Sequence, residues 1–303
     1  MLVSLANMLA DANERNYAVI AANCYNYDSA RALVKAAEAK RSPLIINIAE
    51  GHMKRWIKRD TLALEIGPMC DAADVPVCIN LDHGFTWDVI VSCVANGFTS
   101  VMADSSSYPY EENIARTKKV VEVAHARGVS VEAELGHVGQ GTNAIEDTVS
   151  NLTDPSQAAD FVERTGVDAL AVAVGTAHGE YPADFVPHLD FDRIKEIKAA
   201  CPIPLVLHGG SGSGDENLAH AARIGINKIN IFTDNQANAR KLIYAAMEEN
   251  KKMYPLDMFE IIYDGITEKT CYFMDLFGST GKADDGKFEK FVPKKPLPMF
   301  GDL

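Results

Sequence analysis

The sequence predicts a single (β/α)8 barrel, and two observations carry the prediction. Eight short apolar runs, rich in β-branched or small residues and bounded by turn residues, are spread evenly along the chain. Between them lie helical patterns in which apolar residues recur at three and four positions, as in residues 28–40 and 113–127. Strand–helix alternation forces parallel pairing, and near-continuous apolar strands are typical of a sheet covered on both faces. The predicted strands are residues 17–23, 43–49, 76–82, 100–104, 130–135, 169–175, 204–208 and 228–233.

An open, doubly wound sheet is the structural alternative to a barrel. It would be expected to carry a glycine-rich dinucleotide loop after its first strand, and the sequence has none there. No linker or shift in composition divides residues 1–283, so we expect one barrel domain over that range. Residues 284–303 are rich in Pro and Lys and predict a C-terminal tail, extended on the surface or on a neighbouring subunit.

Charge and composition exclude several classes of partner. The chain has 29 Lys and Arg against 42 Asp and Glu, a net charge of −13, which repels polyanions and argues against binding to nucleic acid or an anionic membrane. No apolar run approaches the roughly 18 residues of a spanning helix, and residues 1–10 lack the features of a signal peptide. The six cysteines contain no C-x-x-C pair and suit reduced thiols in a core. We therefore expect a cytoplasmic protein.

Polar residues gather at the carboxyl ends of the predicted strands, which is where barrels of this kind carry their chemistry. Along the chain these positions hold Asn23, Asp82, His83, Asp104, Glu132, Glu134, His178, His208, Asn230 and Thr233. Such a concentration at one end of the barrel is hard to explain as core filling, so we predict the functional site there.

Three of the eight histidines, His83, His178 and His208, belong to this set. Imidazoles from three strands that converge on one mouth would make an open three-ligand metal site. Asp82 suits general acid/base work beside such a metal, or alternatively the orientation of a metal-bound histidine. Both Asp82 and His83 can face the site only if the strand breaks there, which Gly84 permits. The remaining histidines are interpreted as solvated or locally bonded: His52, His125, His137, His188 and His220.

Two loops predict a site for an anion. The glycine-rich turn at residues 209–212 follows the seventh strand, and residues 230–233 end the eighth, the two places where barrels most often bind phosphate. Glycine lets backbone N–H groups approach an anion closely, so a protein of net charge −13 can hold a phosphate without a basic patch.

Six sequence segments in this order resemble the zinc-dependent class II ketose-bisphosphate aldolases, most nearly the tagatose-bisphosphate type. They are LDHG, VEAELG, GTAHG, LHGGSG, KINIFT and FGSTGKA. The resemblance covers residues 1 to about 283 and implies a (β/α)8 barrel that forms a homodimer or homotetramer. It also implies cleavage of a phosphorylated ketose to dihydroxyacetone phosphate and an aldehyde through an enediolate stabilised by zinc.

The resemblance assigns roles to individual residues. His83, His178 and His208 match the ligands of the catalytic Zn2+, and Asp82 matches the acid/base that takes the hydroxyl proton. Asp104 and Glu134 match a second or alternative metal site, which could hold another metal or a monovalent cation. The residues expected to bind the substrate are Asn23, Gly179, Gly209, Gly210, Ser211, Asn230 and Thr233.

The chain also departs from the family. Ala49 and Phe232 stand where members usually have a hydroxyl and a small or polar residue, and residues 255–269 contain no Arg for a distal phosphate. The loop after the fifth strand lacks the usual Glu, so we assign the base for the three-carbon unit to Glu146, with Asp147 next to it. These changes predict a ketose that carries phosphate only beside the ketone, or one with a distal group other than phosphate.

Two other functions remain open from the sequence. One is a non-catalytic or partner-dependent barrel subunit, which the missing loop Glu favours and the complete Asp and His set disfavours. The other is a metal-dependent hydrolase, disfavoured because no H-x-H pair ends the first strand.

Overall fold

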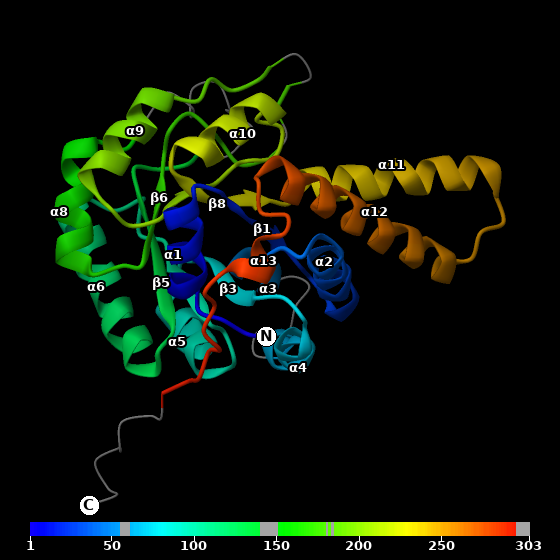
Figure 1. Ribbon diagram of the computed structural model, residues 1–303, viewed down its shortest axis with the longest axis horizontal. Helices are drawn as coiled ribbons and strands as arrows, with labels where there is room; N and C mark the ends of the chain where they lie inside the picture. The colour runs from blue at the N-terminus through cyan, green and yellow to red at the C-terminus, as the bar shows by residue number, and fades with distance from the viewer. Residues whose placement is uncertain (55–60, 140–150, 180, 183–184, 295–303) are drawn as a thin grey trace, which may run out of the picture.

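Eight parallel strands close into a barrel in chain order, with β8 paired to β1 (Figure 1). The computed structural model describes residues 1–54, 61–139, 151–179, 181–182 and 185–294. The strands are β1 Val19–Asn23, β2 Leu44–Ala49, β3 Val77–Gly84, β4 Ser100–Ala103, β5 Ser130–Leu135, β6 Ala169–Val172, β7 Leu205–Leu207 and β8 Ile226–Ile231. The predicted barrel is confirmed, and the strand ends lie within three residues of the predicted positions.

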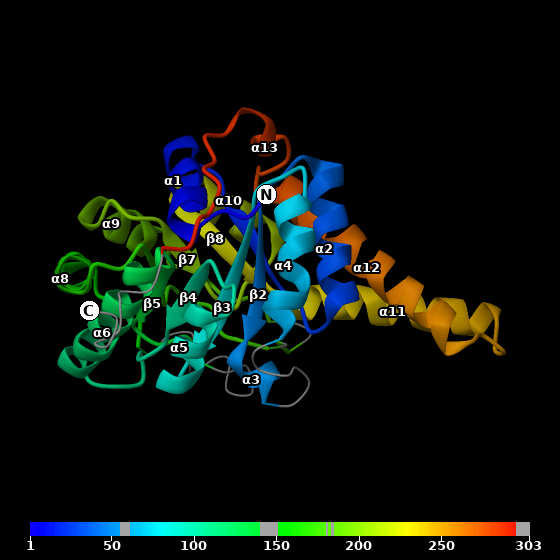
Figure 2. The same ribbon diagram turned by 90° about the horizontal axis from the view of Figure 1, so that it is seen from below.

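Helices alternate with the strands and cover the outside of the barrel (Figures 1 and 2). They are α1 Leu5–Arg15, α2 Tyr27–Lys40, α3 Glu50–Met53, α4 Leu62–Ala72, α5 Trp87–Ala95, α6 Tyr110–Arg127, α8 Pro155–Thr165, α9 Phe191–Ala200, α10 Asp215–Ile224, α11 Thr233–Glu249, α12 Pro255–Leu276 and α13 Lys282–Asp285. Local sequence explains their ends: Asn26 and Ser29 form a capping box at the start of α2. Within the described residues, no helix is both long enough and apolar enough to cross a membrane.

The polarity of the barrel interior changes along the barrel axis. Its amino half is apolar and packs against Leu5, Met8 and Leu9 of α1, which lies across the amino ends of the strands. The strand residues in this apolar cluster are Val19, Ala21, Ile45, Cys78, Met102, Ala169, Ala171 and Val206. Further along the same strands the buried residues become polar, as in Asn23, Glu132 and His208. The barrel interior is therefore apolar at the end that α1 covers and polar at the carboxyl ends of the strands.

The strand β3 ends in an irregular turn that positions the mouth. His83 has φ of +49°, and the pairing register between β3 and β4 shifts between Leu81 and Gly84. The buried Glu50 at the end of β2 holds the next residues, accepting hydrogen bonds from the backbone N–H groups of Phe85 (2.7 Å) and Thr86 (3.1 Å). The predicted break in this strand is therefore present, and His83 itself adopts the left-handed conformation.

Helices α11 and α12 form a hairpin that projects from the side of the barrel in both views (Figures 1 and 2). They cross closely at Gly265, where a Cβ atom would lie 2.9 Å from the Cα of Ala239. The chain then crosses the amino-terminal face, where the N–H groups of Phe291 and Lys294 donate to the carbonyls of Leu2 (2.8 Å) and Arg127 (2.9 Å). The tail as far as Lys294 thus lies on its own barrel.

Gly84→Ala should destabilise the fold, because the added Cβ would lie 2.5 Å from the Met102 carbonyl oxygen and 2.8 Å from Ile90 Cγ1. Overpacking of this kind costs about 1–3 kcal/mol. The matched control is Gly67→Ala in α4, where a Cβ would meet nothing within 4 Å, so stability should rise by up to about 1 kcal/mol. Urea unfolding of both variants measures the difference, and an unchanged midpoint for Gly84→Ala would contradict the prediction.

Candidate active site

Three histidines from different strand ends face one another at the mouth. The ring centroids of His83 and His208 are 4.6 Å apart, those of His83 and His178 are 4.8 Å apart, and those of His178 and His208 are 5.6 Å apart. His83 lies at the end of β3, His208 directly follows β7, and His178 lies in the segment after β6. The structure therefore brings together the three histidines that the sequence predicted as a set.

Hydrogen bonds to the far sides of two rings determine which nitrogens face inward. His83 bonds Asp104 Oδ2 through Nδ1 at 2.7 Å, and His208 bonds Glu132 Oε1 through Nε2 at 2.8 Å. The other two nitrogens, His83 Nε2 and His208 Nδ1, lie 3.0 Å apart. His178 Nε2 is buried and has no hydrogen-bond partner among the described residues. Three ring nitrogens are thus available to bind one metal ion.

The electrostatics of this cluster favour a bound cation. Burial lowers the pKa of His178 to about 4 and that of His208 well below its usual value, and the charge on His83 adds to both shifts. Burial also lowers the pKa of His83, but Asp104, Asp82 and Glu134 outweigh it and raise that pKa to about 9. His178 and His208 are therefore neutral imidazoles, whereas His83 must release a proton to bind a metal; the surrounding carboxylates favour a divalent cation in its place.

Ligand atoms within 4.8 Å of one another define two candidate metal groups in the described part of the chain. The first is His83, His178 and His208, and the second is His83, Asp104 and Glu134. Three histidines with an open fourth position are typical of catalytic zinc, so the residues present fit the metal that the resemblance implies. The second group shares His83 with the first and supplies oxygen ligands.

The second group is held by polar neighbours. Asp104 Oδ1 accepts hydrogen bonds from the Ser106 side chain (2.8 Å) and backbone N–H (3.2 Å), and Ser106 Oγ also bonds His137 Nδ1 (2.9 Å). Burial, reinforced by the charge of Asp104, raises the pKa of Glu134 to about 8. Glu134 Oε2 is buried without a partner among the described residues. His137 therefore lies beside the site through Ser106 and is locally bonded, as interpreted from the sequence.

Asp82 is held by two asparagine side chains rather than by a histidine. Its Oδ2 accepts from Asn23 Nδ2 at 2.7 Å, and its Oδ1 accepts from Asn230 Nδ2 at 3.0 Å. Burial raises its pKa, but interactions with His83, His208 and the Lys228 ammonium, together with the Asn23 hydrogen bond, produce a net lowering. Asp82 is thus an ionised carboxylate at the edge of the cavity, and its hydrogen bonds among the described residues go to asparagines rather than to a metal-site imidazole. This geometry favours acid/base work over the orientation of a ligand.

A cavity of about 350 Å³ opens beside Asp82 and His178. It is lined by Asn23, Ala49, His52, Asp82, His178, Gly179, Gly209, Ser211, Asn230, Phe232 and Thr233. Gly209 has φ of +65°, and a Cβ there would lie 2.4 Å from the Ala177 carbonyl oxygen, so only glycine fits. Ser211 Oγ accepts from the backbone N–H groups of Phe232 and Asp234, each at 3.3 Å, and so ties the loop after β7 to the start of α11.

One wall of this cavity includes His52, a residue that sequence reasoning undervalued. His52, interpreted as a solvated or locally bonded side chain, lies in α3 with its ring centroid 5.0 Å from that of Phe232. Ala49 lines the same cavity. The signal that could have found His52 is its place in the first turn after β2, because residues just beyond strand ends also face the mouth of a barrel.

The predicted loop base lies outside the described residues, as do Asp147 and the whole segment 140–150. The nearest described part of the loop is Gly139, whose carbonyl oxygen accepts from the His178 N–H at 2.8 Å. Glu146 therefore stays a prediction from sequence.

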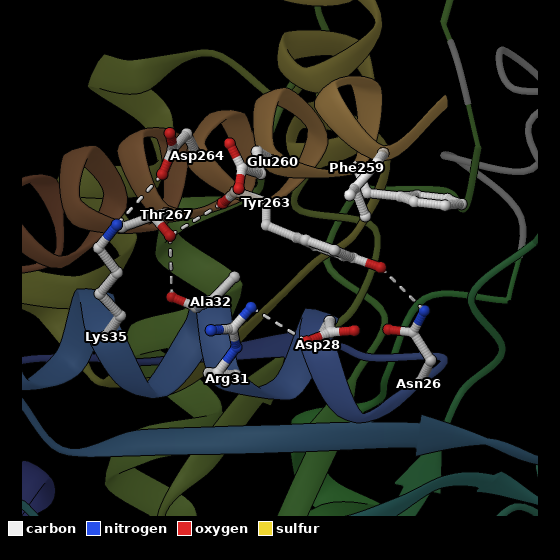
Figure 3. Close-up of a pocket in the computed structure, with 11 residues that line it drawn as sticks. Asn26, Asp28, Arg31, Ala32, Lys35, Phe259, Glu260, Tyr263, Asp264 and Thr267 are labelled. Atoms are coloured by element: carbon white, nitrogen blue, oxygen red, sulfur yellow. Dashed lines mark hydrogen bonds and ion pairs between the residues drawn. The ribbon is translucent and has the colours of Figure 1, made fainter. Parts of the chain in front are cut away.

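A larger cavity, of about 640 Å³, lies between α2 and α12, away from the histidines (Figure 3). Its two cations are paired with aspartates: Arg31 lies 3.1 Å from Asp28, and Lys35 lies 3.1 Å from Asp264. The larger cavity contains none of the predicted metal-binding or acid/base residues, whereas Asp82 and His178 line the smaller cavity at the barrel mouth.

Residues 3–282 match the family described as class-II fructose-bisphosphate aldolase. The chain belongs to this family. It is 40% identical over 286 residues to a fructose-bisphosphate aldolase of Staphylococcus aureus, covering 93% of this chain and 99% of that protein. The family and these relatives confirm the predicted enzyme class, an aldolase and hence a carbon–carbon lyase.

Solved structures agree with the sequence match. The crystal structure of the YdjI aldolase from Escherichia coli K12 superposes with a TM-score of 0.82 at 36% identity, over 94% of this chain and 100% of that one. A putative fructose-1,6-bisphosphate aldolase from Coccidioides immitis gives a TM-score of 0.80 at 30% identity, over 91% and 96% of the two chains.

His208→Ala should abolish divalent metal binding, because it removes one of three nitrogens from a site with about one metal per chain. Metal analysis after dialysis against zinc measures the content of the variant and of the parent. The control is His220→Ala, whose ring packs edge-on against Phe191 with centroids 4.5 Å apart, and which should keep its metal. Parental zinc content and full activity in His208→Ala would disprove the assignment.

Proposed function

We propose that this aldolase uses a divalent metal to cleave a phosphorylated ketose to dihydroxyacetone phosphate and an aldehyde. The observation that carries the proposal is the position of Asp82, which lies between three convergent histidines and a glycine-lined cavity. Zn2+ held by His83, His178 and His208 would act as a Lewis acid on the ketone oxygen of the substrate.

The side chains around the cavity divide the remaining work. Asp82 takes the proton of the hydroxyl next to the carbon–carbon bond that breaks, while the amides of Asn23 and Asn230 hold its two oxygens in place. The electrons of the broken bond move toward the ketone, so the three-carbon unit becomes electron-rich and then accepts a proton. We assign that proton transfer to Glu146.

Backbone groups bind the phosphate in this proposal. The loop at Gly209, Gly210 and Ser211 faces the start of α11 at Thr233, and Gly179 lies on the same cavity wall. N–H groups at a helix start and in a glycine turn attract an anion without any lysine or arginine. Asp104 and Glu134 are proposed to hold a second metal or a monovalent cation beside the reaction.

Asp82→Ala should lower turnover by about 10²- to 10⁴-fold, the usual range for a general acid/base. Bound zinc should be retained, because Asp82 is not among the three histidine ligands. Steady-state cleavage together with metal analysis separates the two roles considered for this residue. If the variant loses its metal and regains activity with added zinc, the role of Asp82 is instead to orient a metal-binding histidine.

The enzyme should prefer a ketose 1-phosphate to fructose 1,6-bisphosphate or tagatose 1,6-bisphosphate. Ala49 and Phe232 place apolar surface on the cavity wall, and a phosphate without charge-assisted donors binds weakly. Of the basic residues after β2 in the sequence, Lys54 is already paired with Glu50 at 2.9 Å, and Arg55, Lys58 and Arg59 lie outside the described residues.

Values of kcat/KM for the two bisphosphates and their 1-phosphates, with and without a chelator, test this preference and the reaction together. Cleavage that needs metal and favours the 1-phosphates supports both parts of the proposal. A clear preference for either bisphosphate means that donors for a distal phosphate exist. Absence of any metal-dependent cleavage would contradict the proposed function itself.

A homodimer or homotetramer stays a prediction. The hairpin of α11 and α12 carries large apolar side chains that are exposed in the single chain: Tyr244, Met247, Tyr254, Leu256 and Phe259. These residues lie on the element that projects from the barrel (Figure 2), so we propose that subunits meet there.

A further inference from the structure

Lys228 is a lysine with no exposed surface, and it lies inside the barrel on β8. Its Nζ atom is 2.8 Å from Glu132 Oε2 and donates to Asn230 Oδ1, also at 2.8 Å. Glu132 in turn bonds His208, and Asn230 bonds both His208 Nδ1 (3.1 Å) and Asp82 Oδ1 (3.0 Å). The four residues Lys228, Glu132, His208 and Asn230 form a closed ring of contacts, to which Asp82 is attached.

The first arm of this ring runs through Glu132 to His208. Glu132 Oε2 forms the ion pair with Lys228, and Glu132 Oε1 is the oxygen that faces His208. A carboxylate can only accept, so His208 Nε2 must carry the proton in this 2.8 Å bond. The lone pair of Nδ1 then points toward His83 Nε2, 3.0 Å away, where a metal would bind.

The second arm runs through Asn230 to Asp82. An ammonium group can only donate, so it fixes the oxygen of the Asn230 amide on the Lys228 side. The amide nitrogen is consequently turned toward Asp82 Oδ1, which accepts its hydrogen bond at 3.0 Å, and it lies 3.1 Å from His208 Nδ1. In the reverse orientation the amide oxygen would face the Asp82 carboxylate, and two acceptors would oppose each other.

We propose that Lys228 is a positioning residue that fixes two things at once: the tautomer of His208 and the orientation of the Asn230 amide on Asp82. The tautomer of His208 affects metal binding, and the orientation of the Asn230 amide affects proton transfer by Asp82. One buried ammonium group therefore influences both parts of the reaction. This inference rests on the proposed function only for its second arm. The competing explanation is that Lys228 merely neutralises the buried charge of Glu132.

Histidine tautomers test the first arm without any reaction. Full-length protein labelled with ¹⁵N-histidine is stripped of metal, and long-range ¹H–¹⁵N spectra report which nitrogen of His208 is protonated, with His208→Gln giving the assignment. The parent should show Nε2–H. In Glu132→Gln the ammonium should attract the new amide oxygen, so the amide nitrogen faces His208 and the tautomer changes to Nδ1–H.

Adding Lys228→Met to Glu132→Gln should reverse that change. Without the ammonium, the introduced amide can turn its oxygen toward His208 and restore Nε2–H, and zinc affinity should recover with it. Altering such an outer partner typically changes affinity about 10- to 100-fold, which is the size of the loss expected in Glu132→Gln and of the recovery expected in the double variant. If both variants show the same tautomer and zinc affinity, Lys228 does not direct His208 and this arm is wrong.

Turnover tests the second arm in the same double variant, which contains neither buried charge and therefore folds without an unpaired ion. With zinc restored, kcat should stay about 10- to 100-fold below the parent, with little change in KM, because the Asn230 amide is no longer oriented. Recovery of kcat together with the unfolding midpoint would show that Lys228 only balances Glu132, and would overturn this arm.

The matched control is Lys198→Met, which removes a lysine from the opposite end of the barrel. Its Nζ donates to the carbonyl of Ile203 (2.9 Å) and to Asn227 Oδ1 (3.1 Å). This variant should lose stability and keep the parent's kcat and His208 tautomer. If the parent itself cleaves no ketose phosphate, the proposed function has failed, while the tautomer measurements still decide the role of Lys228 toward His208.

Discussion

The Glu132 carboxylate lies in the middle of the barrel with no exposed surface, and the mouth of the barrel depends on it. A buried charge without partners costs several kcal/mol, so the group is stable only because His208 and Lys228 each approach it to 2.8 Å. On its amino-terminal side the interior is apolar and sealed by α1. On the other side lie the histidines and Asp82. Removal of Lys228 would leave the Glu132 carboxylate with only its contact to His208, so the polar residues of the mouth act as one network.

Strand ends could be predicted from the sequence because strand residues follow a simple period and the carboxyl ends of parallel strands meet at one mouth. The same reasoning predicts that His83, His178 and His208 lie together, and their rings do face one another. Lys228 was harder to interpret, since it stands within the apolar run KINIFT and its partner Glu132 is 96 positions away in the sequence. Alternation shows that such a lysine is buried, but it does not show which carboxylate across the barrel pairs with it.

The β3 strand shows a second limit of sequence reasoning. The run Asp82, His83 and Gly84 predicts a break after Asp82, with Gly84 as the residue that permits it. In the structure His83 itself adopts the left-handed conformation, with φ of +49°, and Gly84 is needed because Met102 and Ile90 pack against it. Backbone strain in a non-glycine residue persists only where surrounding contacts fix it. Here the 2.7 Å bond to Asp104 and the hydrogen bonds of Glu50 to the following residues supply those contacts.

Reaction type and substrate choice depend on different parts of this molecule. The groups that would hold a metal and move a proton are buried, mutually bonded and attached to the strands, so a change at one is transmitted to the others. Ala49, His52 and Phe232 line the cavity from segments at its rim, and the ring contact of His52 with Phe232 involves no member of the buried network. A change at the rim therefore alters which ketose fits while leaving the network in place. Aldol chemistry can persist in a chain whose cavity wall has lost the polar residues usual for its family, because the apolar side chains of Ala49 and Phe232 form no hydrogen bond with the network.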